Sequence, residues 1–380
     1  LAKAYPVIVM SGARQVGKTS LLAHLFPKWT MISLDHPSQA SFANENPEAF
    51  LQAHQSPLII DEVQYAPNIF RYLKILVDKN RDQKGQYLLT GSQKLTLMEN
   101  VSESLSGRCA VVELETLSLT EILSNRPHQA IADCVIRGGF PEINADPDRD
   151  LDFYFESYLA TYLERDIRNL LRVHNLRDFA RFVRACAYRS GQLLNKAELA
   201  KDIGISPTTA NEWLSILEAS NQIFILEPWF SNKTKGLAKS PKIYMTDSGL
   251  LCHLFNIKSR EDLFHSPAKG AIWESFVCGE LRKHQQWQKG RPELWTLRTL
   301  HQLEVDFLIH RGGRFHLIET KFKESLRTED TASLIEAEKI VGSENILSRS
   351  MILPTEKTGA VKGGKIMIYP PNNLPKMLFE

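Results

Sequence analysis

Short runs of apolar residues alternate with helical patterns along the first third of the chain. The runs at 7–10, 58–60 and 87–89 are continuously apolar, which is typical of parallel strands that are buried on both faces. Stretches with helical periodicity, such as 72–77, lie between them. This alternation predicts an α/β domain over residues 1–125.

The pattern becomes helical in the next segment, because large apolar side chains recur at steps of three and four residues. It predicts a helical connector over residues 126–190. We expect its apolar stripe to pack in a core rather than to form a stacking surface. The stripe consists of Phe155, Tyr158, Leu159, Tyr162, Leu163, Ile167 and Leu170.

Residues 191–250 have helix-turn-helix spacing. A helix at 196–203 ends at a glycine, and a second helix at 208–219 follows Ser206 as N-cap and Pro207 at the first helical position. The pattern predicts a small helix-turn-helix module, followed by an extended run.

A lysine-rich segment follows this run, with no acidic residue between Ser231 and Lys242 and therefore a local charge of +4. Such a segment can contact DNA phosphates, although Glu212 and Glu218 on the second helix are poor partners for phosphate. Three uses of the module stay open: contact with DNA, a lid on the first domain, or protein binding. The candidate DNA contacts are Lys233, Lys235, Lys239 and Lys242.

The last third of the chain returns to an α/β pattern. A helix at 273–283 precedes three strand-like runs between 294 and 319, and a helix at 330–341 is followed by two short strands. This order predicts an α/β domain over residues 262–380.

The composition is ordinary for a globular protein of 380 residues, with 43% hydrophobic and 24% charged. Because 46 Lys and Arg face 44 Asp and Glu, the formal net charge is only +2, so any contact with nucleic acid has to be local. The five cysteines form no C-x-x-C pair, which fits free thiols in a reducing cytosol. No apolar run is long enough to span a membrane. We therefore expect a cytoplasmic protein.

The most specific motif is G-x-x-x-x-G-K-T at residues 12–19, between a predicted strand and a predicted helix. Its glycines let the backbone wrap a phosphate, and its amides supply partial positive charge. Lys18 is expected to reach the β- and γ-phosphates of ATP, and Thr19 to bind Mg²⁺. The predicted nucleotide-binding residues are Gly12, Ala13, Arg14, Gln15, Val16, Gly17, Lys18, Thr19, Ser20 and Asp61.

Three further segments fit an ATP-hydrolysing site. Asp61 and Glu62 end an apolar strand, where Asp61 would hold the metal and Glu62 would polarise the attacking water. Ser92 or Thr90, at the end of the third predicted strand, is a candidate sensor of the γ-phosphate, and an ordinary strand-to-loop turn is the alternative. Arg108 is either an arginine finger, within the chain or toward a neighbouring subunit, or a plain surface residue.

A second group of acidic residues lies in the C-terminal domain. Asp306 lies on one predicted strand, and Glu319 and Lys321 lie on the next, where period-two geometry puts both side chains on one face. Glu274 lies in the preceding helix. Metal-dependent cleavage of phosphodiesters needs clustered carboxylates and a lysine, so Asp306 and Glu319 would bind Mg²⁺, Lys321 would assist the attacking water and Glu274 would complete the cluster. The same residues also fit a fold used only for binding, or a buried ion pair.

Several motifs resemble those of a group of prokaryotic AAA+ proteins that are usually described only as predicted ATPases. The resemblance implies an AAA+ domain, a winged helix and a C-terminal domain of unknown function similar to the PD-(D/E)XK nuclease fold. The chain begins at Leu1, close to the first strand, so residues upstream that contact the nucleotide base are expected to be missing. The motifs are those at 11–19, 61–64, 89–92, 105–108, 138–141 and 242–250.

The leading hypothesis is an ATP-binding, Mg²⁺-dependent ATPase that acts as a molecular switch or motor, with DNA as its candidate target. The alternatives are an ATP-gated, metal-dependent DNA nuclease and a non-catalytic DNA-binding regulator controlled by ATP. A homo-oligomer is compatible with these hypotheses, but Arg108 alone does not establish one.

Overall fold

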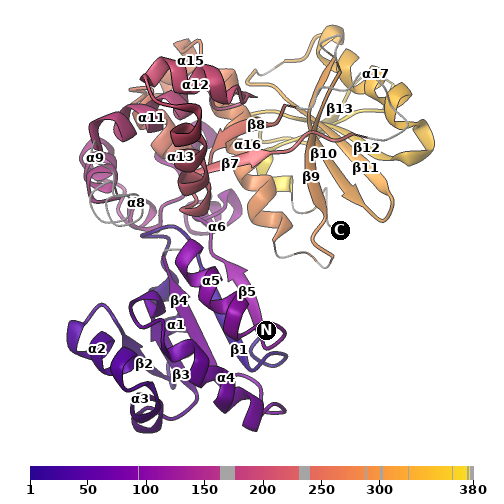
Figure 1. Ribbon diagram of the computed structural model, residues 1–380. Coiled ribbons are helices and arrows are strands. Elements are labelled where there is room, and N and C mark those ends of the chain that lie inside the picture. The colour runs from indigo at the N-terminus through magenta and orange to yellow at the C-terminus, as the bar shows by residue number, and fades with distance from the viewer. Residues whose placement is uncertain are drawn as a thin grey trace. The chain divides into compact units, whose positions relative to one another are not determined.

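The computed structural model describes residues 1–380 except 93, 163–175, 231–239, 287, 289, 300–302, 324, 362, 375 and 377–380. The described chain forms two compact units. The first contains Leu1–Glu115 and Ala219–Asn221, and the second contains Thr116–Glu218 and Gln222–Glu380. Figure 1 shows their elements by label and colour. Among the described helices, none has the length and apolar character needed to cross a membrane.

The first unit is built on a five-stranded parallel sheet with the strand order β2-β3-β4-β1-β5 (Figure 1). All of its strand pairs are parallel, as the continuous apolar runs predict. The strands are β1 (Val7–Ser11), β2 (Thr30–Ser33), β3 (Leu58–Asp61), β4 (Tyr87–Gly91) and β5 (Cys109–Glu113). The helices are α1 (Lys18–Leu25), α2 (Pro37–Glu45), α3 (Pro47–Ala53), α4 (Ile69–Lys79) and α5 (Lys94–Ser104), with a 3-10 turn at Val63–Tyr65.

Hydrophobic side chains cover both faces of this sheet. Val7 and Val9 of β1 belong to one buried cluster, which includes Leu73 of α4. Ile8 and Met10 belong to another, which includes Leu22 of α1. Because successive side chains of a strand point to opposite faces, this division explains why β1 is apolar at every position.

The second unit begins with helices. They are α6 (Leu119–Asn125), α7 (Ile131–Arg137), α8 (Pro141–Ala145), α9 (Leu151–Tyr162), α11 (Leu176–Tyr188), α12 (Lys196–Ile203), α13 (Pro207–Ala219), α14 (Ser248–Leu254), α15 (Arg260–His265) and α16 (Lys269–Gln285). A small antiparallel sheet in the order β6-β8-β7 accompanies them. Its strands are β6 (Gln192–Leu193), β7 (Ile223–Leu226) and β8 (Lys242–Met245).

The turn between α12 and α13 has the predicted chemistry. Gly204 closes α12 in the left-handed conformation, with φ of 81°, and Ser206 Oγ accepts a 3.0 Å hydrogen bond from the Thr209 amide. In α9 the predicted stripe is buried at Phe155, Tyr158 and Tyr162. Its continuation, Leu163, Ile167 and Leu170, lies outside the described residues.

The unit ends in a mixed six-stranded sheet in the order β13-β14-β12-β11-β10-β9, drawn in orange to yellow in Figure 1. Helix α17 (Ala332–Val341) packs on it through Leu334, Ala337 and Val341, which share a buried cluster with Val305 and Leu317. The strands are β9 (Glu293–Arg298), β10 (Glu304–Arg311), β11 (Arg314–Thr320), β12 (Ile346–Ile352), β13 (Gly359–Ala360) and β14 (Met367–Tyr369). Short 3-10 turns lie at Thr328–Thr331, Ser343–Asn345 and Pro371–Asn373.

Candidate functional sites

The glycine-rich loop connects the end of β1 to the first turn of α1. Gly12 has φ of 152°, and a Cβ there would lie 2.3 Å from the carbonyl oxygen of Leu114, so a larger residue does not fit. Gly17 is the N-cap of α1 with φ of 90°. A helix N-terminus at the end of such a loop favours a bound phosphate. The other predicted loop residues, Ala13, Arg14, Gln15, Val16 and Ser20, lie in this same segment.

The ammonium group of Lys18 lies within this loop. It is buried, with 6% of the residue exposed, and it donates to the carbonyl oxygens of Gly12 (2.9 Å) and Ala13 (2.8 Å). The loop backbone and the lysine charge are therefore concentrated in one place, as phosphate binding requires.

Thr19 and Asp61 meet at the carboxyl end of β3. The Thr19 hydroxyl lies 3.1 and 3.2 Å from the two carboxylate oxygens of Asp61. Burial raises the pKa of Asp61, while its hydrogen bond from Thr90 lowers it. A hydroxyl and a carboxylate are oxygen ligands of the kind that Mg²⁺ prefers, so the pair fits the predicted metal position.

Glu62 is connected to both sensor candidates. Its Oε2 accepts a 3.0 Å hydrogen bond from Ser92 and another from the side-chain amide of Gln64. Thr90 Oγ1 donates to Asp61 Oδ1 and accepts a 3.2 Å hydrogen bond from the Glu62 amide. The sequence predicts no contact between Gln64 and Glu62, although both belong to the motif at 61–64.

Arg108 forms a two-point ion pair with Asp78 of α4. Its Nε lies 2.6 Å from Oδ1 and its Nη2 lies 3.0 Å from Oδ2. This pairing holds the guanidinium in a defined orientation, and the role of Arg108 as an arginine finger stays a prediction.

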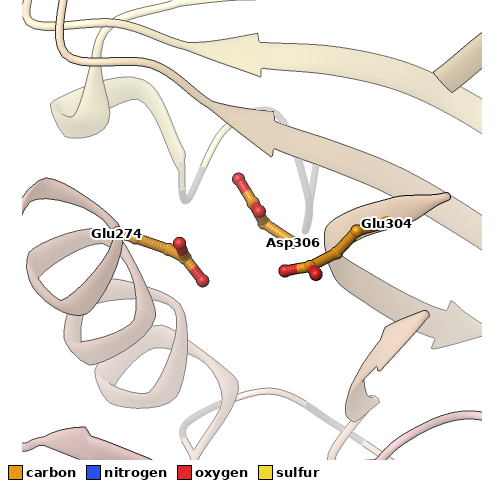
Figure 2. A group of neighbouring side chains, drawn as sticks. All are labelled: Glu274, Glu304 and Asp306. Carbon is orange, nitrogen blue, oxygen red and sulfur yellow. The ribbon is translucent and has the colours of Figure 1, made fainter. Parts of the chain in front are cut away.

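Three acidic side chains of the second unit converge. Figure 2 shows Glu274 pointing from α16 toward Glu304 and Asp306 of β10. One carboxylate oxygen from each lies within 4.8 Å of the others, close enough to hold a metal ion. We refer to these three residues as the carboxylate cluster. Glu304 was not among the predicted ligands, although its i, i+2 spacing from Asp306 puts both on one face of the strand.

The prediction that Lys242 contacts DNA as part of a basic wing is wrong. Only 2% of the residue is exposed, and Nζ lies 2.7 Å from Glu274 Oε1 and 3.9 Å from Asp306 Oδ1, and also forms an ion pair with Glu304. A phosphate cannot reach a lysine buried among carboxylates. The other wing candidates, Lys233, Lys235 and Lys239, lie outside the described residues.

Glu319 and Lys321 lie beside the carboxylate cluster, with Lys321 Nζ 2.6 Å from Glu319 Oε1. Asp306 Oδ2 accepts hydrogen bonds from the amide (2.8 Å) and hydroxyl (2.9 Å) of Thr320. Burial, with the charge of Asp306, raises the pKa of Glu319 to about 8. Burial and the same charge raise the pKa of Glu274 to about 7.

The lysine of the cluster stays protonated. Burial lowers the pKa of Lys242, but Glu274, Asp306 and Glu304 raise it by more, so the net shift is upward. The site therefore combines a permanent ammonium with acidic groups, two of which hold protons more readily than exposed carboxyls do.

Family models match three consecutive parts of the chain. Residues 4–123 match a model described as AAA domain, residues 128–261 match a domain of unknown function (DUF8612), and residues 269–370 match a domain of unknown function (DUF4143). The N-terminal match identifies an ATP-binding domain of the AAA type. The boundaries predicted at 125, 190 and 250 stay predictions.

Two curated relatives are 32% identical to the chain over 320 residues, which are 83% of this chain and 70% of each relative. They are the uncharacterized proteins Rv2008c of Mycobacterium tuberculosis and Mb2031c of Mycobacterium bovis. The chain belongs to the Rv2008c family.

Solved structures are more distantly similar to this member of the Rv2008c family. A RuvB Holliday junction branch migration motor from Thermotoga maritima is 16% identical with a TM-score of 0.28, covering 58% of this chain and 81% of RuvB. The ORC2 protein of Aeropyrum pernix, in its ADP form, is 12% identical with a TM-score of 0.29, at the same coverages. The family assignment does not depend on them.

In this member of the Rv2008c family, the motifs at 138–141 and 242–250 pack against each other. Asp247 Oδ1 accepts from the amides of Gly249 (2.9 Å) and Leu250 (3.0 Å), which caps α14. Asp247 Oδ2 accepts from the amide of Gly139 (2.9 Å). A Cβ on Gly138 would lie 2.3 Å from Asp247 Oδ1, so a glycine is needed there. Sequence reasoning had assigned no role to Asp247.

Proposed function

We propose that the chain is a Mg²⁺-dependent ATPase that uses the loop at 12–19 to bind ATP and works as a molecular switch. The observation that carries the proposal is the hydrogen-bonded chain from Thr19 through Asp61 and Thr90 to Glu62. It connects the end of the phosphate loop to the acidic pair at the end of β3.

Each residue has a defined task in this proposal. Bound Mg²⁺ would neutralise phosphate charge, and Thr19 and Asp61 would hold it. Lys18 would exchange its carbonyl acceptors for oxygens of the β- and γ-phosphates. Glu62 would orient the attacking water and accept its proton, while Ser92 and Gln64 keep the carboxylate of Glu62 in one orientation.

ATP turnover by the purified chain tests this function. Glu62→Gln keeps the shape of the side chain but removes the base, so we expect ATP binding to persist and turnover to fall by about 100-fold or more. Lys18→Ala is expected to lose turnover in a folded protein. Glu48→Gln, on the exposed face of α3, is the matched control and should turn over ATP as the wild type does. A wild type that neither binds nor hydrolyses ATP with Mg²⁺ would refute the proposal.

A second function, contact with DNA, is supported by the helix-turn-helix of α12 and α13 beside the sheet β6-β8-β7. We infer from this order of elements that residues 191–250 form a winged helix. Thr208 and Asn211 lie on the exposed face of α13 and would approach the duplex. Thr208→Asp and Asn211→Asp should weaken salt-dependent duplex binding, whereas Ala332→Asp, at an exposed position of α17, should not. Equal binding by all variants would exclude α13 as the contact.

Acidic residues on helix α16 and on strands β10 and β11 of the C-terminal sheet support the proposal of a fold similar to PD-(D/E)XK nucleases. We do not propose nuclease activity, because the ammonium of Lys242 lies among the oxygens that would bind the metal.

A further inference from the structure

The carboxylate cluster already contains a cation. Lys242 Nζ donates a 2.7 Å hydrogen bond to Glu274 Oε1, forms an ion pair with Glu304, and lies 3.9 Å from Asp306 Oδ1. These are the same three side chains whose oxygens lie close enough together to hold a metal. The lysine therefore sits in the position that a shared ion would take.

A divalent metal and this ammonium cannot both be bound there. An ion ligated by all three carboxylates lies about 2.0–2.6 Å from each oxygen, within the volume that Nζ occupies. Two positive charges at that separation repel each other strongly in a buried site. Metal binding thus requires Lys242 to leave.

The fold holds Lys242 in this position. It begins β8, the central strand of the small sheet, where it pairs with Leu193 on one side and Leu226 on the other. Its side chain is 2% exposed, so withdrawal would leave one buried and two partly buried carboxyl groups without their cation, which is destabilising.

The neighbouring oxygens offer no complete alternative set. Asp306 Oδ2 already accepts two hydrogen bonds from Thr320, and Glu319 Oε1 accepts from Lys321. Glu319 Oε2 is buried without a partner among the described residues. The other oxygen of Asp306, Oδ1, lies 3.9 Å from Lys242 Nζ, so a divalent ion bound between Asp306 Oδ1 and Glu319 Oε2 would lie beside the ammonium and be repelled by it.

We propose that Lys242 is the resident cation of the carboxylate cluster and that the native chain binds no divalent metal there. The cluster then serves to join β8, α16 and β10 through ion pairs, and it does not take part in metal-dependent cleavage. The ammonium takes the electrostatic place of the metal, and removing it should convert the cluster into a metal site.

Mn²⁺ binding to the full chain without nucleotide, followed by electron paramagnetic resonance, tests the proposal. We expect the wild type and Asp306→Asn to bind the same number of ions. Lys242→Ala should gain one Mn²⁺ site, with affinity at least about tenfold above any wild-type binding, and Lys242→Ala/Asp306→Asn should lose it. Lys258→Ala removes an exposed lysine that is paired with Asp152 and should gain no site.

Two results would overturn the proposal. One is a wild-type Mn²⁺ site that disappears in Asp306→Asn or Glu304→Gln, because metal would then bind with Lys242 in place. The other is a folded Lys242→Ala chain that gains no site. The wild-type comparison does not depend on Lys242→Ala folding. If that variant folds only with Mn²⁺ present, and the double variant does not, the metal has replaced the ammonium as proposed.

Discussion

The hydroxyl of Tyr244 donates a 2.6 Å hydrogen bond to Glu274 Oε1, the oxygen that also accepts from Lys242. Lys242 and Tyr244 are two residues apart on β8, so both side chains point to the same face of the strand. They meet a carboxylate of α16 that lies about thirty residues further along the chain. Two residues of the 242–250 motif thus contact the same partly buried glutamate, Glu274.

Tyr244→Phe should destabilise the second unit measurably. Tyr244 is 1% exposed, and removing its hydroxyl takes a donor from a buried acidic group, which costs about 1.5–3 kcal/mol. Urea unfolding followed by circular dichroism measures the loss. Tyr188→Phe, at a residue that is 49% exposed, is the control and should change stability by less than about 0.5 kcal/mol. Equal effects of the two variants would show that the hydrogen bond contributes little.

Asp247→Ala should be more damaging than the loss of an ordinary helix cap. Asp247 is 4% exposed and satisfies the amides of Gly249, Leu250 and Gly139. Caps contribute about 1 kcal/mol, and a further buried donor left without a partner costs about 1–3 kcal/mol. Ser259→Ala removes the cap of exposed α15 and provides the comparison in thermal unfolding. Similar losses in both variants would contradict a linking role for Asp247.

Glu319→Gln should change how stability depends on pH. Burial raises the pKa of Glu319 from 4.5 to about 8, so the folded chain retains a proton that the unfolded chain releases. Stability therefore falls as pH rises through this window. Glutamine does not titrate, so the variant should gain stability relative to the wild type between about pH 5 and pH 8. We expect a gain above about 1.4 kcal/mol, the equivalent of one pKa unit.

Unfolding at several pH values measures this difference. Glu336→Gln, at an exposed position of α17, is the control and should stay parallel to the wild type. A stability difference between Glu319→Gln and the wild type that stays constant, or shrinks as pH rises, would rule out a raised pKa at Glu319.

The candidate nucleotide site can be proposed from the sequence because its signals are local. Lys18 and Thr19 stand in a contiguous loop motif, and Asp61 and Glu62 stand at the end of an apolar strand. The sequence also placed Glu319 and Lys321 on one face, since period-two geometry depends only on near neighbours, but it did not predict their ion pair. The parallel sheet followed from apolar runs that are buried on both faces.

The environment of Lys242 could not be predicted from the sequence. Three lysines precede it within ten residues and no acidic residue lies among them, so the local composition predicts a basic surface. Its actual environment is made by Glu274, Glu304 and Asp306, which come from α16 and β10 and are brought to it by tertiary folding. The charge partners of a residue are set by contacts between distant segments, and a single sequence does not contain them.

Arg108 and Asp78 allow the arginine-finger hypothesis to be separated from a surface ion pair. Both side chains are partly exposed, at 22% and 38%, and exposed pairs contribute little to stability, so Arg108→Ala and Asp78→Ala should both fold. A finger stabilises charge on the transferred phosphoryl group, and its loss typically lowers turnover by about a thousandfold or more. We expect Arg108→Ala to show such a loss at saturating ATP and Mg²⁺. Asp78→Ala keeps the guanidinium and should retain turnover within about threefold of the wild type. If Arg108→Ala hydrolyses ATP at the wild-type rate, Arg108 is a surface residue and another group must stabilise the transition state.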